Sequence, residues 1–339
     1  MGDDLRPNAP PECPAPLRIA TIGISPDAVF HLEAAAIRDE LIPVAAARTD
    51  DSESSHEPVP GCAVCSIDEL AERSDVDAVF VVGPVEDRVD NAIRILRSGK
   101  HVIVEPAGSL AADQIRRLIS EVESSQKFCE VWRPYNADPD FRRAAKVVSC
   151  GEAGPVQSLR FMQHDLAAAL VPRAESAATR DRLTSSTLRD LAAHRIAQAL
   201  ALVGAPVTEF TTRFHTNSLV LGERDSLRPV TPEGATSFHA VIEFEHGAAA
   251  IIDIGLACPA PFSTGWIVQG NQGGYHSDRQ YITVDDGEIY DVAVEVEPFD
   301  PYLSLHSVFS NWPNPERIKQ CLDQLRAELE LAMLLLKIP

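Results

Sequence analysis

GKHVIVEPAGSL, residues 99–110, contains a short apolar run that ends at Glu105 and Pro106 and leads into a helical pattern. Its core, HVIV, is rich in β-branched residues, which fit a pleated and buried surface. Strands buried on both faces of a parallel sheet show such unbroken apolar segments. The stretch therefore predicts a central strand over 101–105 that is followed by a helix over about 110–125.

The same order of strand and helix extends upstream and downstream of this stretch. Apolar runs predict strands over 17–24, 41–47, 77–83, 101–105 and 127–132, and helical patterns separate them over about 26–40, 67–73, 86–98 and 110–125. Strands that alternate with helices pair in parallel through right-handed crossovers. The fold class is therefore α/β, and residues 17–133 are expected to form a Rossmann-like, doubly wound dinucleotide-binding domain behind a flexible, Pro-rich tail over 1–16.

A different pattern begins at about residue 134. One helix over 139–149, a strand over 156–166 and a helix over 185–203 precede strand-like runs at 207–215, 236–246, 248–257, 265–270 and 280–296. The Asp285–Gly287 segment has the composition of a hairpin turn. Consecutive strands with short turns predict an open, mostly antiparallel sheet in a second domain over 134–339, which ends in a helix over 315–337.

Composition excludes several classes of protein. The 339 residues suit two domains, and 45% hydrophobic with 24% charged residues is typical of a globular protein. A net charge of −20 argues against nucleic-acid and membrane partners. No apolar run approaches the roughly 20 residues of a membrane span, and the acidic N-terminus differs from a signal peptide. We expect a cytoplasmic protein. Cys62 and Cys65 form a C-x-x-C without a nearby histidine cluster, so no metal site is expected.

The turn after the first strand has part of a dinucleotide fingerprint. Gly23, Ser25 and Ala28 occupy the three positions of G-x-G-x-x-G/A, and Ser25 replaces the middle glycine, where a Cβ obstructs approach of the pyrophosphate. Ser25-Pro26-Asp27 is also a strong helix start, with a cap, a proline and an acid in the first turn. The turn therefore favours either a phosphate site or a self-capped helix that holds no ligand.

The end of the second strand bears on the choice of cofactor. NAD-binding sites place Asp or Glu about 20 residues after the first glycine, where this chain has Ala45–Ala47 and then Arg48. An arginine at this point suits the 2′-phosphate of NADP. NADP is therefore favoured over NAD, with a surface arginine as the alternative.

These motifs together resemble a known family. DVDAVFVVGP (75–84), GKHVIVE (99–105) and LRDLAAHRI (188–196), in this domain order, are similar to the Gfo/Idh/MocA oxidoreductases over about residues 17–337. The resemblance implies a small-molecule substrate, an NAD or NADP cofactor and a homo-oligomer formed through the C-terminal sheet. It also implies that Gly83, Pro84 and Glu105 line the cofactor site.

Position by position, the resemblance is uneven. Glu105 matches the family's glutamate, but Pro106 replaces the lysine that hydrogen-bonds the reacting group. Proline offers neither a polar side chain nor an N–H. Asp190 and His194 match the family's D-x-x-x-H, whereas Ala197 replaces the aspartate that follows. Of the expected acid/base residues, His194 remains.

His194 is therefore the candidate proton donor. It lies one helical turn after Asp190, so the two side chains share a helix face and can pair. Such a pair is expected to orient the imidazole and to raise its pKa. Tyr135 is a secondary candidate donor beside the start of the second domain.

Three functions agree with this sequence. The first is an NAD(P)(H)-dependent oxidoreductase that acts on a carbonyl, imine or sugar-like molecule. The second is a non-redox enzyme on the same scaffold, for elimination, isomerisation or cyclisation. The third is a catalytically inactive ligand-sensing or regulatory member. The retained Asp190 and His194 favour an enzyme, because a regulator needs no acid/base pair.

Overall fold

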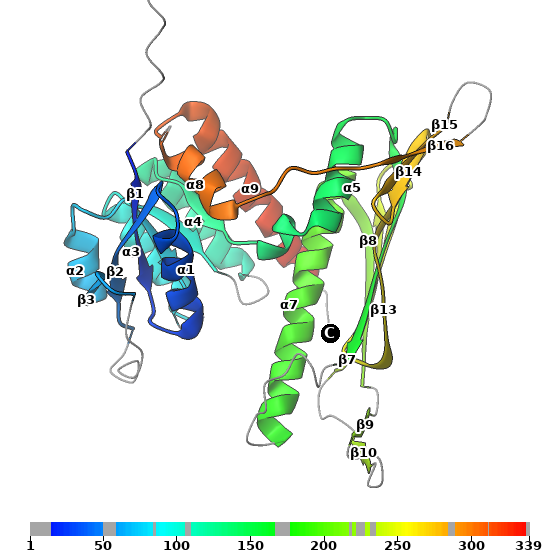
Figure 1. Ribbon diagram of the computed structural model, residues 1–339, viewed down its shortest axis with the longest axis horizontal. Coiled ribbons are helices and arrows are strands. Elements are labelled where there is room, and N and C mark those ends of the chain that lie inside the picture. Colours follow the sequence, from blue (N-terminus) through cyan, green and yellow to red (C-terminus); the bar gives the residue numbers. More distant parts are fainter. Residues whose placement is uncertain are drawn as a thin grey trace, which may run out of the picture. The chain divides into compact units, whose positions relative to one another are not determined.

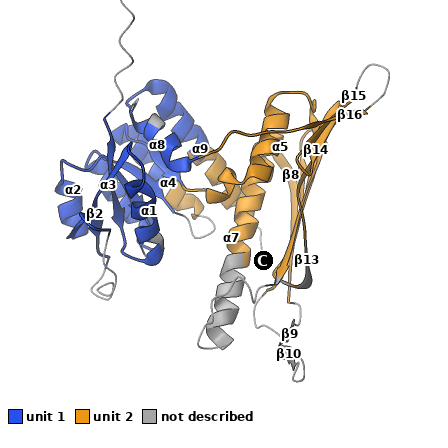
Figure 2. Ribbon diagram, in the orientation of Figure 1, with its two compact units in different colours: residues 1–105, 117–131, 300–324 blue, residues 106–116, 132–299, 325–339 orange. Residues whose placement is uncertain are grey.

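The computed structural model describes residues 15–49, 59–83, 86–105, 110–166, 177–216, 219–221, 228–230, 235–283, 289–310 and 312–336. Two compact units divide the chain (Figure 2). The first contains residues 1–105, 117–131 and 300–324, and the second contains residues 106–116, 132–299 and 325–339. The chain therefore returns to the first unit after it has built most of the second.

The first unit contains a six-stranded parallel sheet with the order β3-β2-β1-β4-β5-β6. Its strands are β1 (Leu17–Ile22), β2 (Leu41–Ala47), β3 (Ala63–Cys65), β4 (Ala78–Val81), β5 (His101–Val104) and β6 (Cys129–Val131). Every residue of β4 and β5 is buried, which explains their unbroken apolar sequences. The predicted doubly wound sheet is confirmed, and its strand order reverses between β1 and β4.

Helices join these strands and begin within two residues of the predicted starts. They are α1 (Pro26–Ala36), α2 (Ile67–Glu72), α3 (Arg88–Arg97) and α4 (Ala112–Ser125). The Ser66 and Glu69 side chains form a capping box at the start of α2. A helix that was not predicted, α8 (Pro301–Ser310), is anchored in this unit by a 2.8 Å hydrogen bond between Tyr302 Oη and His31 Nδ1.

The second unit contains an eight-stranded sheet with the order β16-β15-β14-β13-β7-β12-β11-β8. Its strands are β7 (Val156–Leu166), β8 (Val207–His215), β11 (Ser237–Phe244), β12 (Ala249–Gly255), β13 (Ala257–Gly270), β14 (Gly273–His276), β15 (Arg279–Thr283) and β16 (Ile289–Ala293). Only the β7–β12 pairing is parallel among the described strands of this sheet. The predicted open, mostly antiparallel sheet is confirmed. Two short strands, β9 (Leu219–Leu221) and β10 (Arg228–Val230), pair separately.

One face of this sheet is covered and the other is open. Helices α5 (Pro139–Ser149) and α7 (Ala177–Val203) lie along one face, as Figure 1 shows. The strands alternate accordingly: Phe238, Ala240, Ile242 and Phe244 of β11 are buried in the core, and the residues between them point away. No helix of this unit covers the opposite face within the described ranges, so that face carries half-exposed apolar side chains.

Some expected elements differ from the structure. Helix α7 begins at Ala177 rather than at 185, and β14 was not predicted because its Gly-Gly sequence has low strand propensity. The proposed hairpin turn at Asp285–Gly287 and most of the N-terminal tail lie outside the described residues.

The last helix, α9 (Pro315–Leu335), has Leu325, Leu329, Met333 and Leu336 at helical spacing, a pattern that predicts a buried stripe extending to Met333 and Leu336. These two side chains are exposed instead. The buried positions are Cys321, Leu325, Glu328, Leu331, Ala332 and Leu334, so the buried face passes through Leu325 but turns away from Met333 and Leu336. An acid on the buried face therefore needs a partner.

Within the described residues, no helix combines the length and apolar character that crossing a membrane requires. The same part of the chain holds no group of three or more His, Cys, Asp or Glu side chains arranged around a possible metal position. Cys62 and Cys65 are free thiols whose pKa values are raised by burial, so their C-x-x-C spacing does not create a reactive pair.

Candidate active site

Two glycines face each other where the strand order of the first unit reverses. Gly23 follows β1 with φ of +104°, and Gly83 follows β4. A Cβ on Gly23 would lie 3.1 Å from the Gly83 nitrogen, and a Cβ on Gly83 would lie 2.6 Å from Cγ2 of Thr49. Open α/β sheets bind ligands outside the carboxyl ends of their strands at this reversal. Both glycines are therefore required by the close packing of the strand ends at the expected cofactor position.

The helix that follows Gly23 is capped by its own chain. Ser25 is the N-cap of α1, its Oγ accepts a 3.3 Å hydrogen bond from the Ala28 nitrogen, and Pro26 occupies the first turn. Ala28 is fully buried, so it serves the close helix–sheet packing that the third fingerprint position requires. The side chain of Asp27 lies outside the described part of the structure. The self-capped helix start is confirmed: Pro26 has no N–H, and the Ala28 and Val29 nitrogens both donate to Ser25.

Arg88, which the sequence did not single out, connects two strand ends at the same edge. Its Nε donates to the Gly83 carbonyl oxygen at 2.7 Å, and its Nη1 donates to the Glu105 carbonyl oxygen. Because α3 begins at Arg88, the guanidinium fixes the ends of β4 and β5 relative to this helix. Pro84 and Pro106 lie outside the described residues, so the structure adds nothing on these two positions.

Arg48 lies directly after β2 with an exposed side chain. Its backbone nitrogen donates to the Cys65 carbonyl oxygen at 3.1 Å. The residues at this edge therefore match a dinucleotide site in part: glycines follow two strands, a helix begins after the first of them, and an exposed cation follows β2.

His194 in the second unit is almost fully enclosed. It lies on α7 with 7% of its surface exposed, and its ring centroid is 4.8 Å from that of Tyr135. Nη1 of Arg133 contacts His194 Nδ1 at 3.4 Å. Nε2 of the same ring forms no hydrogen bond with any described residue. Within that part of the chain, Nε2 does not belong to the side-chain atoms that are both fully buried and without a hydrogen-bond partner. One nitrogen is therefore fixed, and the other remains available.

The expected rise in the His194 pKa was wrong. Burial, together with the positive charges of Arg133 and Arg195, lowers the His194 pKa to about 3. The sequence suggested that the Asp190 carboxylate would dominate because it lies one turn away. Instead, two guanidinium groups lie near the ring: Arg133 is distant in the sequence, and Arg195 is the next residue on α7. His194 is therefore a neutral imidazole at physiological pH.

Arg133 is itself held by an acid that the sequence did not single out. Its Nε donates to Oε1 of Glu328 at 2.8 Å, and its Nη2 donates to Oε2. The two side chains are only 4% and 8% exposed. The signal in the sequence was Glu328 itself, a lone carboxylate on the apolar face of the last helix, because such a group is buried only with a partner.

A second set of polar contacts holds Tyr135. Gln198 Nε2 donates to the Tyr135 carbonyl oxygen at 2.7 Å, and Gln198 Oε1 accepts from Arg195 Nη1 at 2.8 Å. The Arg195 guanidinium lies 5.0 Å from the centre of the Tyr135 ring. Burial raises the pKa of Tyr135, so its hydroxyl stays protonated at neutral pH. The structure therefore places His194 and Tyr135 side by side, with Asp190 near enough to Tyr135 to raise its pKa further.

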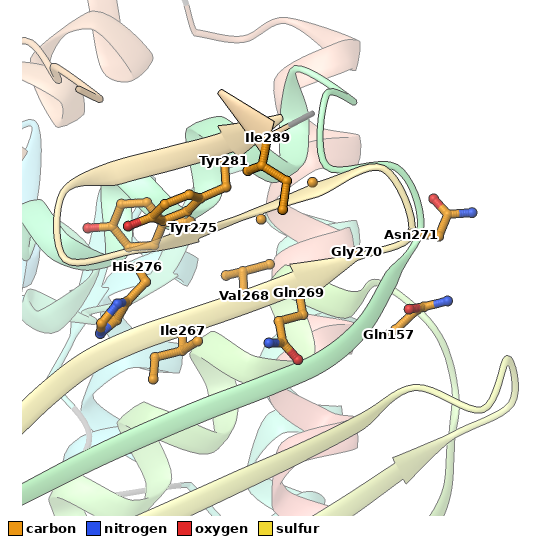
Figure 3. Close-up of a pocket in the computed structure, with 12 residues that line it drawn as sticks. Gln157, Ile267, Val268, Gln269, Gly270, Asn271, Tyr275, His276, Tyr281 and Ile289 are labelled. Atoms are coloured by element: carbon orange, nitrogen blue, oxygen red, sulfur yellow. The ribbon is translucent and has the colours of Figure 1, made fainter. Parts of the chain in front are cut away.

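Two other histidines lie elsewhere on the second sheet and share one carboxylate. His164 Nε2 and His239 Nδ1 both contact Asp253 Oδ1, at 3.0 and 3.1 Å, across three adjacent strands. A hollow of about 450 Å³ lies farther along the sheet, over β13–β16, where Ile267, Gln269 and Tyr281 surround it (Figure 3). It contains none of the expected site residues, and Ile267 and Gln269 alternate with the buried Trp266 and Val268. The hollow therefore belongs to the open sheet face.

Comparison with known proteins decides the family. Residues 17–132 match a model described as an oxidoreductase family with an NAD-binding Rossmann fold, and residues 141–276 match the GFO/IDH/MocA C-terminal domain. The chain belongs to the Gfo/Idh/MocA oxidoreductase family. The two matched segments carry the domains of an NAD(P)-dependent oxidoreductase, and the implied family resemblance is confirmed.

Individual relatives are distant. A dTDP-3,4-didehydro-2,6-dideoxy-α-D-glucose 3-reductase from Streptomyces violaceoruber is 26% identical over 270 residues, which are 78% of this chain and 73% of that protein. A 1-carboxy-3-chloro-3,4-dihydroxycyclohexa-1,5-diene dehydrogenase from Comamonas testosteroni is 26% identical over 54% of this chain and 43% of its own length. The crystal structure of an NAD-binding protein from Listeria innocua shares the fold, with a TM-score of 0.67 and 17% identity over 94% of this chain and 98% of that one.

Proposed function

We propose that this Gfo/Idh/MocA protein reduces a carbonyl or imine of a sugar-like small molecule with NADPH, or catalyses the reverse oxidation. The observation that carries the proposal is the state of His194: one ring nitrogen is fixed by Arg133, and the other has no partner in the described residues. An otherwise enclosed imidazole with an available nitrogen can contact a reacting oxygen. The sugar-like substrate is supported by the name of the Streptomyces violaceoruber reductase.

The nicotinamide, when bound, supplies or accepts the hydride. The residues of the chain stabilise the charge that develops on the substrate oxygen or nitrogen. A neutral His194 donates a hydrogen bond from Nε2, and a fixed donor in an enclosed site stabilises such a charge better than water does. The Tyr135 hydroxyl remains protonated and adjacent, so it is the proton source that we assign. Asp190 lies near this pair from one turn earlier on α7.

The cofactor side of the proposal predicts selective loss of NADPH binding in Arg48→Ala. A charge-assisted hydrogen bond contributes about 1.5–3 kcal/mol, so NADPH affinity should fall by roughly tenfold to a hundredfold while NADH affinity stays unchanged. Quenching of tryptophan fluorescence during separate NADPH and NADH titrations measures both. Arg94→Ala on the surface of α3 serves as the control and should change neither.

The other possible outcomes of this titration would contradict different parts of the proposal. An equal response of both nucleotides to Arg48→Ala would make Arg48 a surface residue and remove the preference for NADP. No response of the wild-type chain to either nucleotide at millimolar concentration would reject the redox function. Binding without turnover across carbonyl, imine and polyol substrates would favour the ligand-sensing alternative.

We further propose that the open face of the eight-stranded sheet packs against a second copy of the chain. This face of the described part of the unit carries exposed apolar side chains: Val241 is 41% exposed, Ile251 41% and Phe262 56%. Val241 lies on β11 and Ile251 on β12, and the opposite face of both strands is buried. An uncovered sheet face with such side chains is typical of an association surface.

Ile251→Asp is therefore expected to convert the oligomer to monomers without unfolding it, because a carboxylate in the centre of an apolar interface is desolvated without a partner. Light scattering after size exclusion measures the mass, and circular dichroism checks the fold. Ile42→Asp on β2 is the matched control, since Ile42 is 42% exposed but lies in the other unit. A monomeric wild-type chain, or an Ile251→Asp oligomer, would contradict the proposal.

A further inference from the structure

The imidazole of His194 has two nitrogens with different surroundings. Nδ1 faces Nη1 of Arg133 at 3.4 Å, and Nε2 has no partner among the described residues. A guanidinium has five N–H donors, no acceptor, and a charge that it does not lose in proteins. In this contact Nδ1 can therefore only accept. The ring hydrogen then belongs to Nε2.

We infer that Arg133 is a positioning residue that fixes the Nε2–H tautomer of His194 and so presents a neutral hydrogen-bond donor to the substrate. The tautomer follows from the contacts of the chain alone. Its use in catalysis rests on the oxidoreductase function proposed above, in which Nε2 contacts the reacting oxygen or nitrogen.

Glu328 makes this arrangement stable. A lone guanidinium could not remain enclosed beside His194, because a buried charge without a partner costs several kcal/mol. The bidentate contact with Glu328 compensates the charge of Arg133 and fixes the plane of its guanidinium. With Nε and Nη2 used by the carboxylate, Nη1 is the nitrogen that faces His194. The direction of the hydrogen bond to Nδ1 is therefore set by residues of β6's C-terminal end and of α9.

The charged and titratable groups around His194 support a neutral ring. Arg133 approaches from the turn after β6, Arg195 is the next residue on α7, and the Tyr135 ring lies beside the imidazole at an interplanar angle of 54°. Asp190 on α7 and Asp138 before α5 act on Tyr135 and Arg195 rather than on the imidazole. Both guanidinium groups disfavour protonation of the imidazole, and burial acts in the same direction. The ring therefore donates as a neutral group rather than as an imidazolium.

Nuclear magnetic resonance of the full chain tests the tautomer without any cofactor or substrate. In protein labelled with ¹⁵N-histidine, two-bond ¹H–¹⁵N correlations distinguish the two tautomers, and the signals lost in His194→Gln assign the ring. We expect the Nε2–H pattern for His194, with no titration between pH 5 and 8. An Nδ1–H pattern in the wild-type chain would overturn the inference.

The double substitution Arg133→Met/Glu328→Met tests the role of Arg133. It removes both charges together, so neither is left buried alone. We expect mixed tautomers and a titration midpoint at least one pH unit higher, because the donor to Nδ1 and one of the repelling charges are gone. Arg73→Gln/Asp75→Asn removes another bidentate pair, in the first unit, and should leave the His194 signals unchanged. An unaltered tautomer in the Met/Met protein would overturn the inference.

Kinetics separate this inference from the proposed function. If the protein turns over, the Met/Met variant should lose about tenfold or more of kcat/KM, since the wrong tautomer disables a histidine even where its position is kept. Any limb of its pH–rate profile that comes from ionisation of His194 should lie at least one pH unit higher than in the wild-type chain. Absence of turnover in every protein would reject the oxidoreductase proposal and leave the tautomer result standing.

Discussion

Glu328→Ala is expected to lower the free energy of unfolding by about 3–5 kcal/mol, because it leaves the Arg133 guanidinium buried without its counter-charge. The wild-type pair is bidentate, and the side chains are 4% and 8% exposed, so water cannot replace the lost carboxylate. Urea denaturation at pH 7, extrapolated to water, measures the change.

The matched comparison is the Arg133→Met/Glu328→Met protein. Replacing a whole buried ion pair by apolar side chains of similar size is often neutral, so this variant should be far more stable than Glu328→Ala despite carrying one more substitution. Asp291→Ala, which removes an exposed partner of Arg279, should cost little because exposed pairs contribute little. A small effect of Glu328→Ala would mean that water reaches Arg133 in solution.

His194→Ala is expected to lower kcat/KM by about 10²–10³, which is the usual effect of removing one donor from a developing negative charge. Because the His194 pKa is about 3, the neutral form prevails from pH 5 to 8 in the wild-type protein. Ionisation of His194 should therefore add no limb to the pH–rate profile in this range. Steady-state reduction with NADPH across these pH values measures both effects.

His246→Ala, in the exposed turn between β11 and β12, is the control and should keep wild-type rates. A limb with a midpoint between pH 5 and 7 that disappears in His194→Ala would show that His194 acts as an imidazolium. That result would contradict both the low pKa and the assignment of Tyr135 as the proton source.

The fold was predictable from the sequence where burial leaves a simple pattern. The strands around HVIV are buried on both faces, so their apolar runs located β4 and β5 within one or two residues. The antiparallel strands alternate, and β8 and β7 agree with the expected ranges. Helix α8 was missed because its anchor, the contact between Tyr302 and His31, joins residues far apart in the chain. Neither local propensity nor periodicity reports such a contact.

The site was predictable only in part for the same reason. The spacing of Asp190 and His194 correctly placed both on one helix, but the His194 pKa depends on Arg133 and on burial, which the spacing does not reveal. Arg133 and Glu328 are 195 positions apart. The sequence contained a single hint of their contact, an acid among leucines in α9, and it could not identify the partner.

The serine at the start of α1 has a consequence for how the nucleotide arrives. In many dinucleotide sites the glycine at this position leaves the helix amides waiting for the pyrophosphate. Here Ser25 already occupies one of them through its hydroxyl. A pyrophosphate oxygen that accepts from the Ala28 nitrogen would have to replace Ser25 Oγ, and loss of this N-cap hydrogen bond costs about 1 kcal/mol. We therefore expect this helix to be capped before the nucleotide binds, and the affinity for the nucleotide to be lower than with a glycine at position 25.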